Sequence, residues 1–302
     1  MTRSTSDEFA YYAKHGTITE PGLYKELFDN LPADISGLRD IVQGLLLHVF
    51  WAERYGEKLS EERAAEAGIR HVKLMLTRIM EIDDRPIVDR RPLSQKLVGN
   101  CRTFSVLLAA MLQSQGRPAR ARCGFGRYFV PGWNEDHWIC EYWNDQQSRW
   151  IMLDAQLDDF QCQELQIDFD PLDVPRDQFI VGGRAWLDCR SDEADPAKYG
   201  IFDMRGLWFV RGNLIRDVAA LNKVELLPWD GWGLIDRKDD DISLEELSSL
   251  DEVASMTADE VDFFPVRMAY DTNKGLVVPP EITCYTKSGT VKIDLGTETV
   301  VD

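Results

Sequence analysis

Three side chains in the middle of the chain have the types that cysteine-dependent acyl transfer requires: Cys101, His137 and Asp154. The stretch GNCRTFSVLLAAMLQSQGRP places Cys101 at the start of a predicted helix, where free backbone N–H groups and the helix dipole stabilise a thiolate. The backbone N–H of Cys101 is also a candidate donor to an oxyanion. A small buried core cysteine explains the position equally well when it is taken alone.

The segments HWICEYW and RWIMLD, residues 137–143 and 149–154, are predicted to form an antiparallel hairpin around the turn NDQQ. With that turn the numbers of paired residues sum to 291, so His137 is expected to face Asp154 directly. The carboxylate would then hold the imidazole in one tautomer and stabilise its charged form. Without the cysteine, an ordinary strand start and strand end explain the two residues equally well.

Few other residues compete for these roles. His15 lies in a polar leader, and His48 and His71 fall in predicted helices without a cysteine or carboxylate at a suggestive spacing, which favours core-edge or surface positions. His137 is the only histidine downstream of Cys101 and is therefore the candidate base. Gln95, six residues before the cysteine, is a candidate for a second oxyanion donor, although an ordinary linker glutamine explains it better.

The elements that must position these residues follow from periodicity and punctuation. Residues 19–82 are predicted to be helical, with one apolar stripe running from Leu38 to Val49 and a further helix opening at Ser60. Residues 83–96 look like a linker, and the helix after Asn100 closes at Gly116. Three strand-like runs follow, ARARCGFGRYF, HWICEYW and RWIMLD. A helix followed by antiparallel strands predicts an α+β fold.

The last third of the chain is predicted in less detail. Residues 169–183 are expected to be a loop and Leu207–Leu221 a helix. Capping boxes are expected at Ser243 and Thr257, and a hairpin is expected to turn at Ser288-Gly289. The predicted organisation is an N-terminal helical region at 1–92, a catalytic core at 93–200 and a C-terminal helical and acidic extension at 201–302.

Composition narrows the classes of partner. In 302 residues, 34 basic against 52 acidic side chains give a net charge of −18, which argues against a nucleic-acid partner. No apolar run reaches the ~20 residues of a membrane span, so a cytoplasmic protein without a membrane partner is expected. Six scattered cysteines without a CxxC pair predict reduced thiols and no zinc site. The acidic run 239–241 lacks the pattern of a calcium loop, and no cofactor is predicted.

The stretches GNCRTFSVLLAAMLQSQGRPARAR and DHWICEYWNDQQSRWIMLDAQLD resemble the core of the transglutaminase-like superfamily. The resemblance covers about residues 97–158 and implies a papain-like core with a nucleophile helix packed on an antiparallel sheet. Cys101, His137 and Asp154 match the positions of its catalytic triad, and Trp150 matches the tryptophan before the aspartate. Trp138 departs from the pattern, because a small residue commonly follows the histidine. No calcium loop is recognisable, so calcium activation is not implied.

Together these observations predict a cysteine enzyme that attacks an amide or peptide bond through a thioester at Cys101. Hydrolysis is favoured over cross-linking because nothing in the sequence marks an amine site. The expected partner is a peptide, a protein or a small amide. The alternative is a binding or scaffold protein that keeps the fold without turnover.

Overall fold

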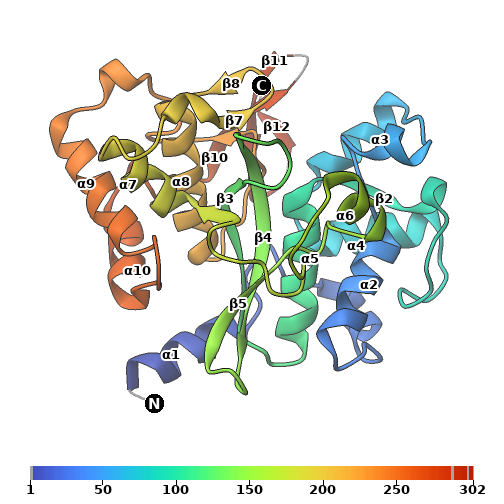
Figure 1. Ribbon diagram of the computed structural model, residues 1–302. Coiled ribbons are helices and arrows are strands. Elements are labelled where there is room, and N and C mark those ends of the chain that lie inside the picture. Colours follow the sequence, from blue (N-terminus) through green and yellow to red (C-terminus); the bar gives the residue numbers. More distant parts are fainter. Residues whose placement is uncertain (1–2, 287–288, 298, 302) are drawn as a thin grey trace. The chain divides into compact units, whose positions relative to one another are not determined.

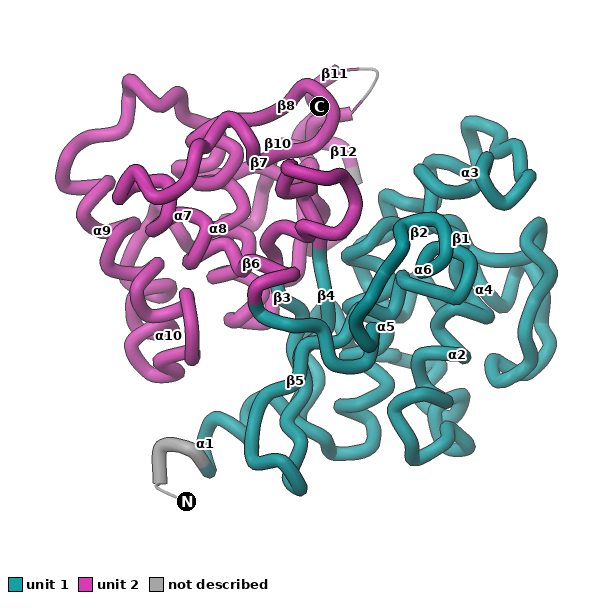
Figure 2. The backbone as a smooth tube through the Cα atoms, viewed as in Figure 1, with its two compact units in different colours: residues 1–122, 138–176 teal, residues 123–137, 177–302 magenta. Residues whose placement is uncertain are grey.

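The computed structural model describes residues 3–286, 289–297 and 299–301 and divides the chain into two compact units (Figure 2). The first unit comprises residues 1–122 and 138–176, and the second comprises residues 123–137 and 177–302. Strands β3 (Ala119–Gly126) and β4 (Asn134–Asn144) each begin in one unit and end in the other. These compact units do not test the predicted sequence domains 1–92, 93–200 and 201–302, which stay a prediction.

The first unit is mainly helical (Figure 1). Its α-helices are α1 (Arg3–Tyr12), α2 (Ile35–Leu45), α3 (Glu61–Ala65), α4 (Val72–Ile82), α5 (Cys101–Ser114) and α6 (Asp159–Leu165). Short 3-10 helices lie at Gly22–Phe28, Ala52–Tyr55, Glu66–Gly68 and Leu93–Gln95. The strands are β1 (Leu46–His48), β2 (Leu97–Gly99), β5 (Arg149–Leu153) and residues 138–144 of β4.

Helix α5 forms where the sequence predicts it. The Asn100 side chain accepts a hydrogen bond from the backbone N–H of Thr103 at 3.2 Å, and Gly116 adopts a left-handed φ of 71° just beyond the helix. Every residue from Cys101 to Gln113 is buried, and the helix contacts α2, α4 and β2. Burial on all sides of the helix makes α5 the centre of this unit.

The predicted N-terminal helices are wrong in two places. The first ends at Leu45, short of Val49, because the chain extends into β1 and pairs in parallel with β2, with His48 opposite Gly99. The helix predicted from Ser60 is broken after Ala65 and resumes at Val72, with a 3-10 turn ending at Gly68, a poor helix former. His48 therefore lies in a strand and His71 at a helix N-cap, and neither lies inside a helix.

The β4–β5 hairpin forms, but its predicted register is wrong. The pairs run from Cys140↔Leu153 to Asn144↔Arg149, so paired numbers sum to 293, and Ile139 comes opposite the position of Asp154. His137 therefore does not face Asp154 directly. The observed register pairs Trp143 with Trp150, whose rings meet edge to face with centroids 6.0 Å apart. That cross-strand aromatic pair would have been lost in the predicted register.

The second unit combines helices and short strands. Its helices are α7 (Gly182–Arg190), α8 (Leu207–Leu221), α9 (Leu244–Ser255) and α10 (Phe263–Thr272), with 3-10 turns at Pro196–Lys198 and Asp239–Asp241. Its strands are β6 (Phe179–Val181), β7 (Tyr199–Ile201), β8 (Met204–Arg205), β9 (Asp230–Gly231), β10 (Glu281–Thr286), β11 (Gly289–Asp294) and β12 (Thr299–Val301). Helix α7 contacts α8 and α9, and β9–β12 form a sheet in the order β12-β11-β10-β9.

Strand pairing in this unit corrects one prediction. The segment expected as a loop, 169–183, contains β6, which pairs antiparallel with β3 through Phe125↔Ile180, and Gly182 already begins α7. The start of β4 pairs in parallel with β7, through Asn134↔Tyr199. The pair of β4 with β7 is thus parallel, whereas β3 with β6, β4 with β5 and β7 with β8 are antiparallel. The α+β prediction is confirmed.

The C-terminal predictions have mixed outcomes. Helix α8 and the β10–β11 hairpin are confirmed; Gly289 is the first residue of β11, whereas Ser288 lies outside the described residues. The capping box at Ser243 is confirmed. The one at Thr257 is wrong, because Thr257 lies just after α9, where its hydroxyl donates to the carbonyl of Val253 at 3.2 Å. Helix α10 begins later, after Asp262.

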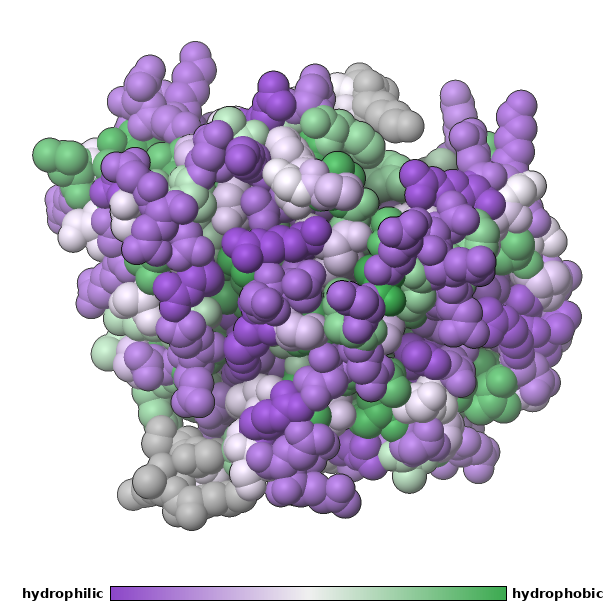
Figure 3. Space-filling model, viewed as in Figure 1, coloured by the Kyte–Doolittle hydropathy of each residue, from purple (hydrophilic) through white to green (hydrophobic). Residues whose placement is uncertain are grey.

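Hydrophilic residues predominate on the face drawn in Figure 3, and hydrophobic residues form small scattered patches there. Among the described residues, no helix has both the length and the apolar character that crossing a membrane requires. Within the same part of the chain, no group of three or more His, Cys, Asp or Glu side chains could hold a metal ion.

Candidate active site

Cys101 is the first residue of α5 and belongs to the first unit. Its neighbour Asn100 fixes the start of the helix from both sides, since its N–H donates to the Thr103 hydroxyl at 3.2 Å while its side chain caps Thr103. The Asn100 amide also donates to the carbonyl of Ala67 at 3.1 Å, which ties this turn to the preceding 3-10 segment. Cys101 itself is 7% exposed, so the thiol lies buried at a capped helix start.

Three other cysteines are poor nucleophiles for a physical reason. Burial raises the pKa of the Cys140 thiol well above its usual range. Burial also raises the pKa of the Cys189 thiol to about 12 and that of the Cys162 thiol to about 11. A raised pKa keeps each of these thiols protonated near neutral pH. Cys123 and Cys284 are buried in strands β3 and β10. Cys101, by contrast, is the first residue of a helix.

Asp154 also belongs to the first unit and directly follows β5. It is 1% exposed; its carboxylate accepts the N–H of Gln156 at 3.0 Å, and its own N–H donates to the carbonyl of Pro171 at 2.9 Å. The first contact orients the carboxylate, and the second fixes the backbone of Asp154. Gln156 was not predicted from the sequence, because its contact depends on the turn after β5.

His137 belongs to the second unit and lies in β4. It is 2% exposed and surrounded by three aromatic rings, with centroids 5.9 Å away for Tyr128, 4.7 Å for Phe129 and 6.2 Å for Phe179. Such edge contacts restrict rotation of the imidazole. None of these three residues was predicted from the sequence as a neighbour of His137. Phe179 lies in β6, which was expected to be loop, and only strand pairing could reveal it.

A buried polar contact anchors the strand beside His137. The Asp136 carboxylate accepts the Asn213 side-chain amide at 2.7 Å, and the same amide donates to the carbonyl of Gly124 at 3.1 Å. Burial raises the pKa of Asp136, although Asn213 and the charge of Arg216 oppose the shift. Because successive strand residues point to opposite faces, this anchor fixes β4 on α8 from the face opposite His137.

Two further residues singled out from the sequence have defined surroundings. The side-chain oxygen of Gln95 accepts a hydrogen bond from the Arg85 guanidinium at 3.2 Å, which supports the simpler interpretation of Gln95 as a linker residue. Trp138 is fully buried, and its indole N–H has no hydrogen-bond acceptor among the described residues. The indole of Trp138 therefore packs in the core.

A comparison with known protein families agrees with the resemblance in the sequence. Residues 54–155 match the model of the transglutaminase-like superfamily, so this segment of the chain is transglutaminase-like. No curated protein matches the chain. A solved structure described as "a Putative Cysteine Protease from Cytophaga hutchinsonii" is similar at 14% identity and a TM-score of 0.33. The match covers 58% of this chain and 45% of that one, so the chain spans less than half of that protein's length.

Proposed function

We propose that the protein is a cysteine-dependent acyl-transfer enzyme that cleaves an amide or peptide bond. The observation that carries this proposal is that the transglutaminase-like segment, residues 54–155, contains Cys101 at the start of a capped helix together with His137 and Asp154. The composition further supports a cytoplasmic protein that requires no bound cofactor.

In the proposed reaction, the imidazole of His137 accepts the proton of the Cys101 thiol, and the thiolate attacks the carbonyl carbon. The backbone N–H of Cys101 stabilises the oxyanion. When the tetrahedral intermediate collapses, the C–N bond breaks, the imidazolium gives its proton to the leaving amine, and a thioester remains on Cys101. Water activated by His137 then releases the acid and the free thiol. Asp154 acts as the positioning residue that orients the imidazole.

The decisive experiment is alkylation of the native protein with iodoacetamide at pH 6 to 7, followed by mass mapping. An ordinary thiol has a pKa of ~8.5 and reacts slowly there. We expect Cys101 to react much faster than the other cysteines, and Cys101→Ala to remove that fast phase. Cys162→Ala is the matched control and should leave it unchanged. If Cys101 reacts no faster than Cys162, the protein is a non-catalytic member of its fold and the proposal fails.

The roles within the triad separate on substitution. His137→Ala should remove the fast alkylation at pH 6 to 7, because the thiol then loses the base that accepts its proton. Asp154→Asn should reduce turnover or the alkylation rate by a smaller amount, on the order of 10- to 10³-fold, since a cysteine depends less on an oriented base than a serine does. An unchanged rate in a folded Asp154→Asn variant would place the third residue elsewhere.

A further inference from the structure

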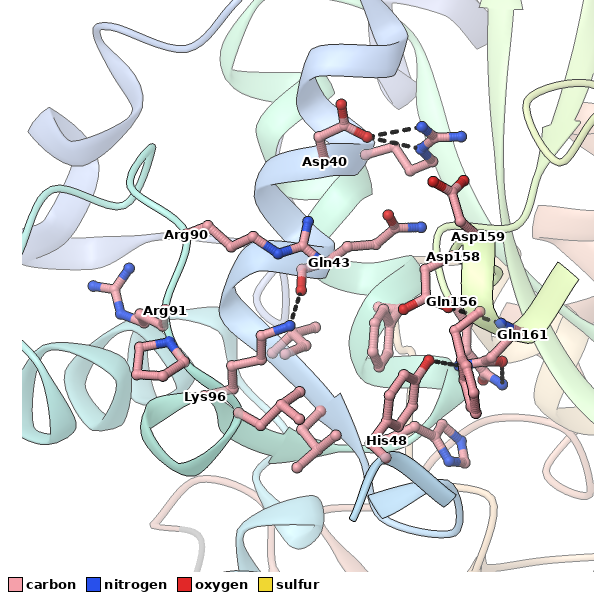
Figure 4. A pocket seen from close by; sticks show the side chains of 18 residues that line it. Asp40, Gln43, His48, Arg90, Arg91, Lys96, Gln156, Asp158, Asp159 and Gln161 are labelled. Atoms are coloured by element: carbon pink, nitrogen blue, oxygen red, sulfur yellow. Dashed lines mark hydrogen bonds and ion pairs between the residues drawn. The ribbon is translucent and has the colours of Figure 1, made fainter. Parts of the chain in front are cut away.

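The first unit contains a cavity of about 580 Å³ that does not include any of the three proposed catalytic residues in its walls. Its walls come from α2, β1, the segment 90–96, Phe104 of α5 and the segment 156–161. Figure 4 shows Arg90 and Lys96 on one side of this cavity and Asp158, Gln156 and Gln161 on the other. The volume is in the range of small-molecule sites.

Lys96 is a buried ammonium without a close counter-ion. It is 4% exposed, and its Nζ donates one hydrogen bond to the carbonyl of Gln43 at 2.6 Å. Among the described residues no carboxylate forms an ion pair with it, although Asp158 acts on it at longer range. Burial, together with the charge of Arg90, lowers the pKa of Lys96 to about 8. Buried charges are normally paired, so this ammonium lacks the anion that would complete it.

The other cations of the cavity differ in how they are engaged. Arg39 pairs with Asp40 at 2.8 Å, and the buried Arg91 donates to the backbone carbonyls of Asp83 and Arg85. Arg90 is exposed and has no ion-pair or hydrogen-bond partner within the described part of the chain. Lys96 and Arg90 therefore remain as donors to an anionic group.

The opposite wall presents a buried acceptor. The Gln156 amide donates to the Gln161 oxygen at 3.1 Å, and the Gln161 amide donates to the Tyr55 hydroxyl at 3.1 Å. The side-chain N–H of Gln156 is therefore hydrogen-bonded within the protein, whereas its side-chain oxygen has no donor among the described residues. Gln156 is 2% exposed, so its unpaired oxygen calls for a donor from a ligand.

Two contacts connect this cavity with residues of the proposed site. Phe104 lies three residues after Cys101 in α5, and side chains at that spacing have Cβ atoms about 5–6 Å apart. Gln156 donates its backbone N–H to the Asp154 carboxylate at 3.0 Å. The cavity thus borders Phe104, one helical turn after Cys101, and Gln156, whose backbone binds Asp154.

We infer that the cavity binds the carboxylate-bearing part of an amide substrate, with the carboxylate at Lys96 and Arg90 and an amide or amino N–H at Gln156. The carboxyl end of a short peptide carries both groups. The ligand is a substrate only if the proposed function holds, and in that respect the inference rests on it. The binding itself does not require catalysis.

The test uses the full chain with Cys101→Ala, so that nothing is turned over. Two libraries of N-acetyl tripeptides, both without Asp and Glu, differ only in a free or an amidated carboxyl terminus, and bound peptide is measured after ultrafiltration. We expect the free-carboxylate library to be retained about 10- to 100-fold more strongly, as for a charge-assisted hydrogen bond. Equal retention of the two libraries, or retention of neither, would overturn the inference.

Matched variants assign the binding to the cavity. Lys96→Met should lower retention of the free carboxylates to the level of the amides, and Arg90→Gln, at an exposed position, should weaken it in the same direction. Lys58→Met, at an exposed lysine outside the cavity, should change nothing. Carboxylate binding that Arg90→Gln and Lys96→Met both leave intact would refute the site. Binding without a reactive Cys101 would instead refute the proposed enzyme and the substrate role.

Discussion

Buried cations in the first unit have two different kinds of surroundings. Arg120 and Arg122, 3% and 0% exposed, both donate to one carboxylate oxygen of the fully buried Glu141, at 2.8 and 3.1 Å. Arg120 also reaches Glu8 at 3.0 Å and lies over the ring of Trp150 at 3.8 Å. Lys96 is equally buried but has only the Gln43 carbonyl and a cavity beside it.

The difference separates a structural group of charges from an incomplete one. The arginines outweigh the burial of Glu141 and hold the pKa of its carboxyl at about 2, well below the usual range, so the cluster is charged at neutral pH. Each of its members is satisfied inside the protein. The pKa of Lys96 is also lowered, by burial and the charge of Arg90, but for a lysine this shift disfavours the charged form. An unsatisfied buried charge beside a cavity points to a ligand.

The largest expected effect comes from Glu141→Gln, which leaves the guanidinium groups of Arg120 and Arg122 buried without their carboxylate. We expect a loss of about 3–5 kcal/mol in the free energy of unfolding, measured by urea denaturation at pH 7. Arg176→Gln is the matched control, because Arg176 contacts the same carboxylate at 3.2 Å but is 48% exposed; it should cost less than about 1 kcal/mol. A loss for Glu141→Gln no larger than that of the control would show that the cluster is not structural.

An acid titration tests another solution to the same problem, a buried base that stays neutral. Burial, reinforced by the charges of Arg102, Lys73 and Arg70, lowers the pKa of His71 from 6.5 to about 4. The unfolded chain therefore binds more protons between these values, and the His71 contribution to stability should fall as the pH drops from 6.5 to 4. The measurement is the free energy of unfolding against pH. His71→Gln should flatten this slope relative to the wild type, and identical slopes would contradict the assignment.

Lys96→Met should have a much smaller effect on the free protein than Glu141→Gln. The variant loses the hydrogen bond to Gln43 but no longer buries an uncompensated ammonium, so the change should stay within about 1 kcal/mol of zero. A loss as large as that of Glu141→Gln would make Lys96 part of the structural core and would break the comparison.

A last test uses the alkaline side of the stability curves of the same two proteins, wild type and Lys96→Met. With a folded pKa of about 8 against 10.5 for an ordinary lysine, Lys96 binds its proton less well in the folded state. Its contribution to the free energy of unfolding should therefore rise between pH 8 and 10.5. The difference between wild type and Lys96→Met, taken at pH 8 and 9.5, isolates this group. A constant difference would mean that Lys96 titrates normally.

Local sequence determined α5 and the helix start at Cys101, because a cap, an apolar stripe and a terminal glycine act within a few residues of one another. The strands of the β4–β5 hairpin and helix α8 were predictable for the same reason, and the motif of Cys101, His137 and Asp154 could be recognised by type and spacing. These features depend on short-range geometry and need no knowledge of distant neighbours.

Only the tertiary structure decided the rest, because its causes lie between residues far apart in the chain. The pairing of Trp143 with Trp150 set the hairpin register, and the parallel contact of β1 with β2 ended α2 early. The aromatic rings around His137 come from two separate segments, Tyr128 and Phe129 after β3 and Phe179 in β6. The environment of Lys96 beside the cavity likewise depends on where the fold places the carboxylates. The order of residue types along the chain does not show which of them come close to a buried ammonium.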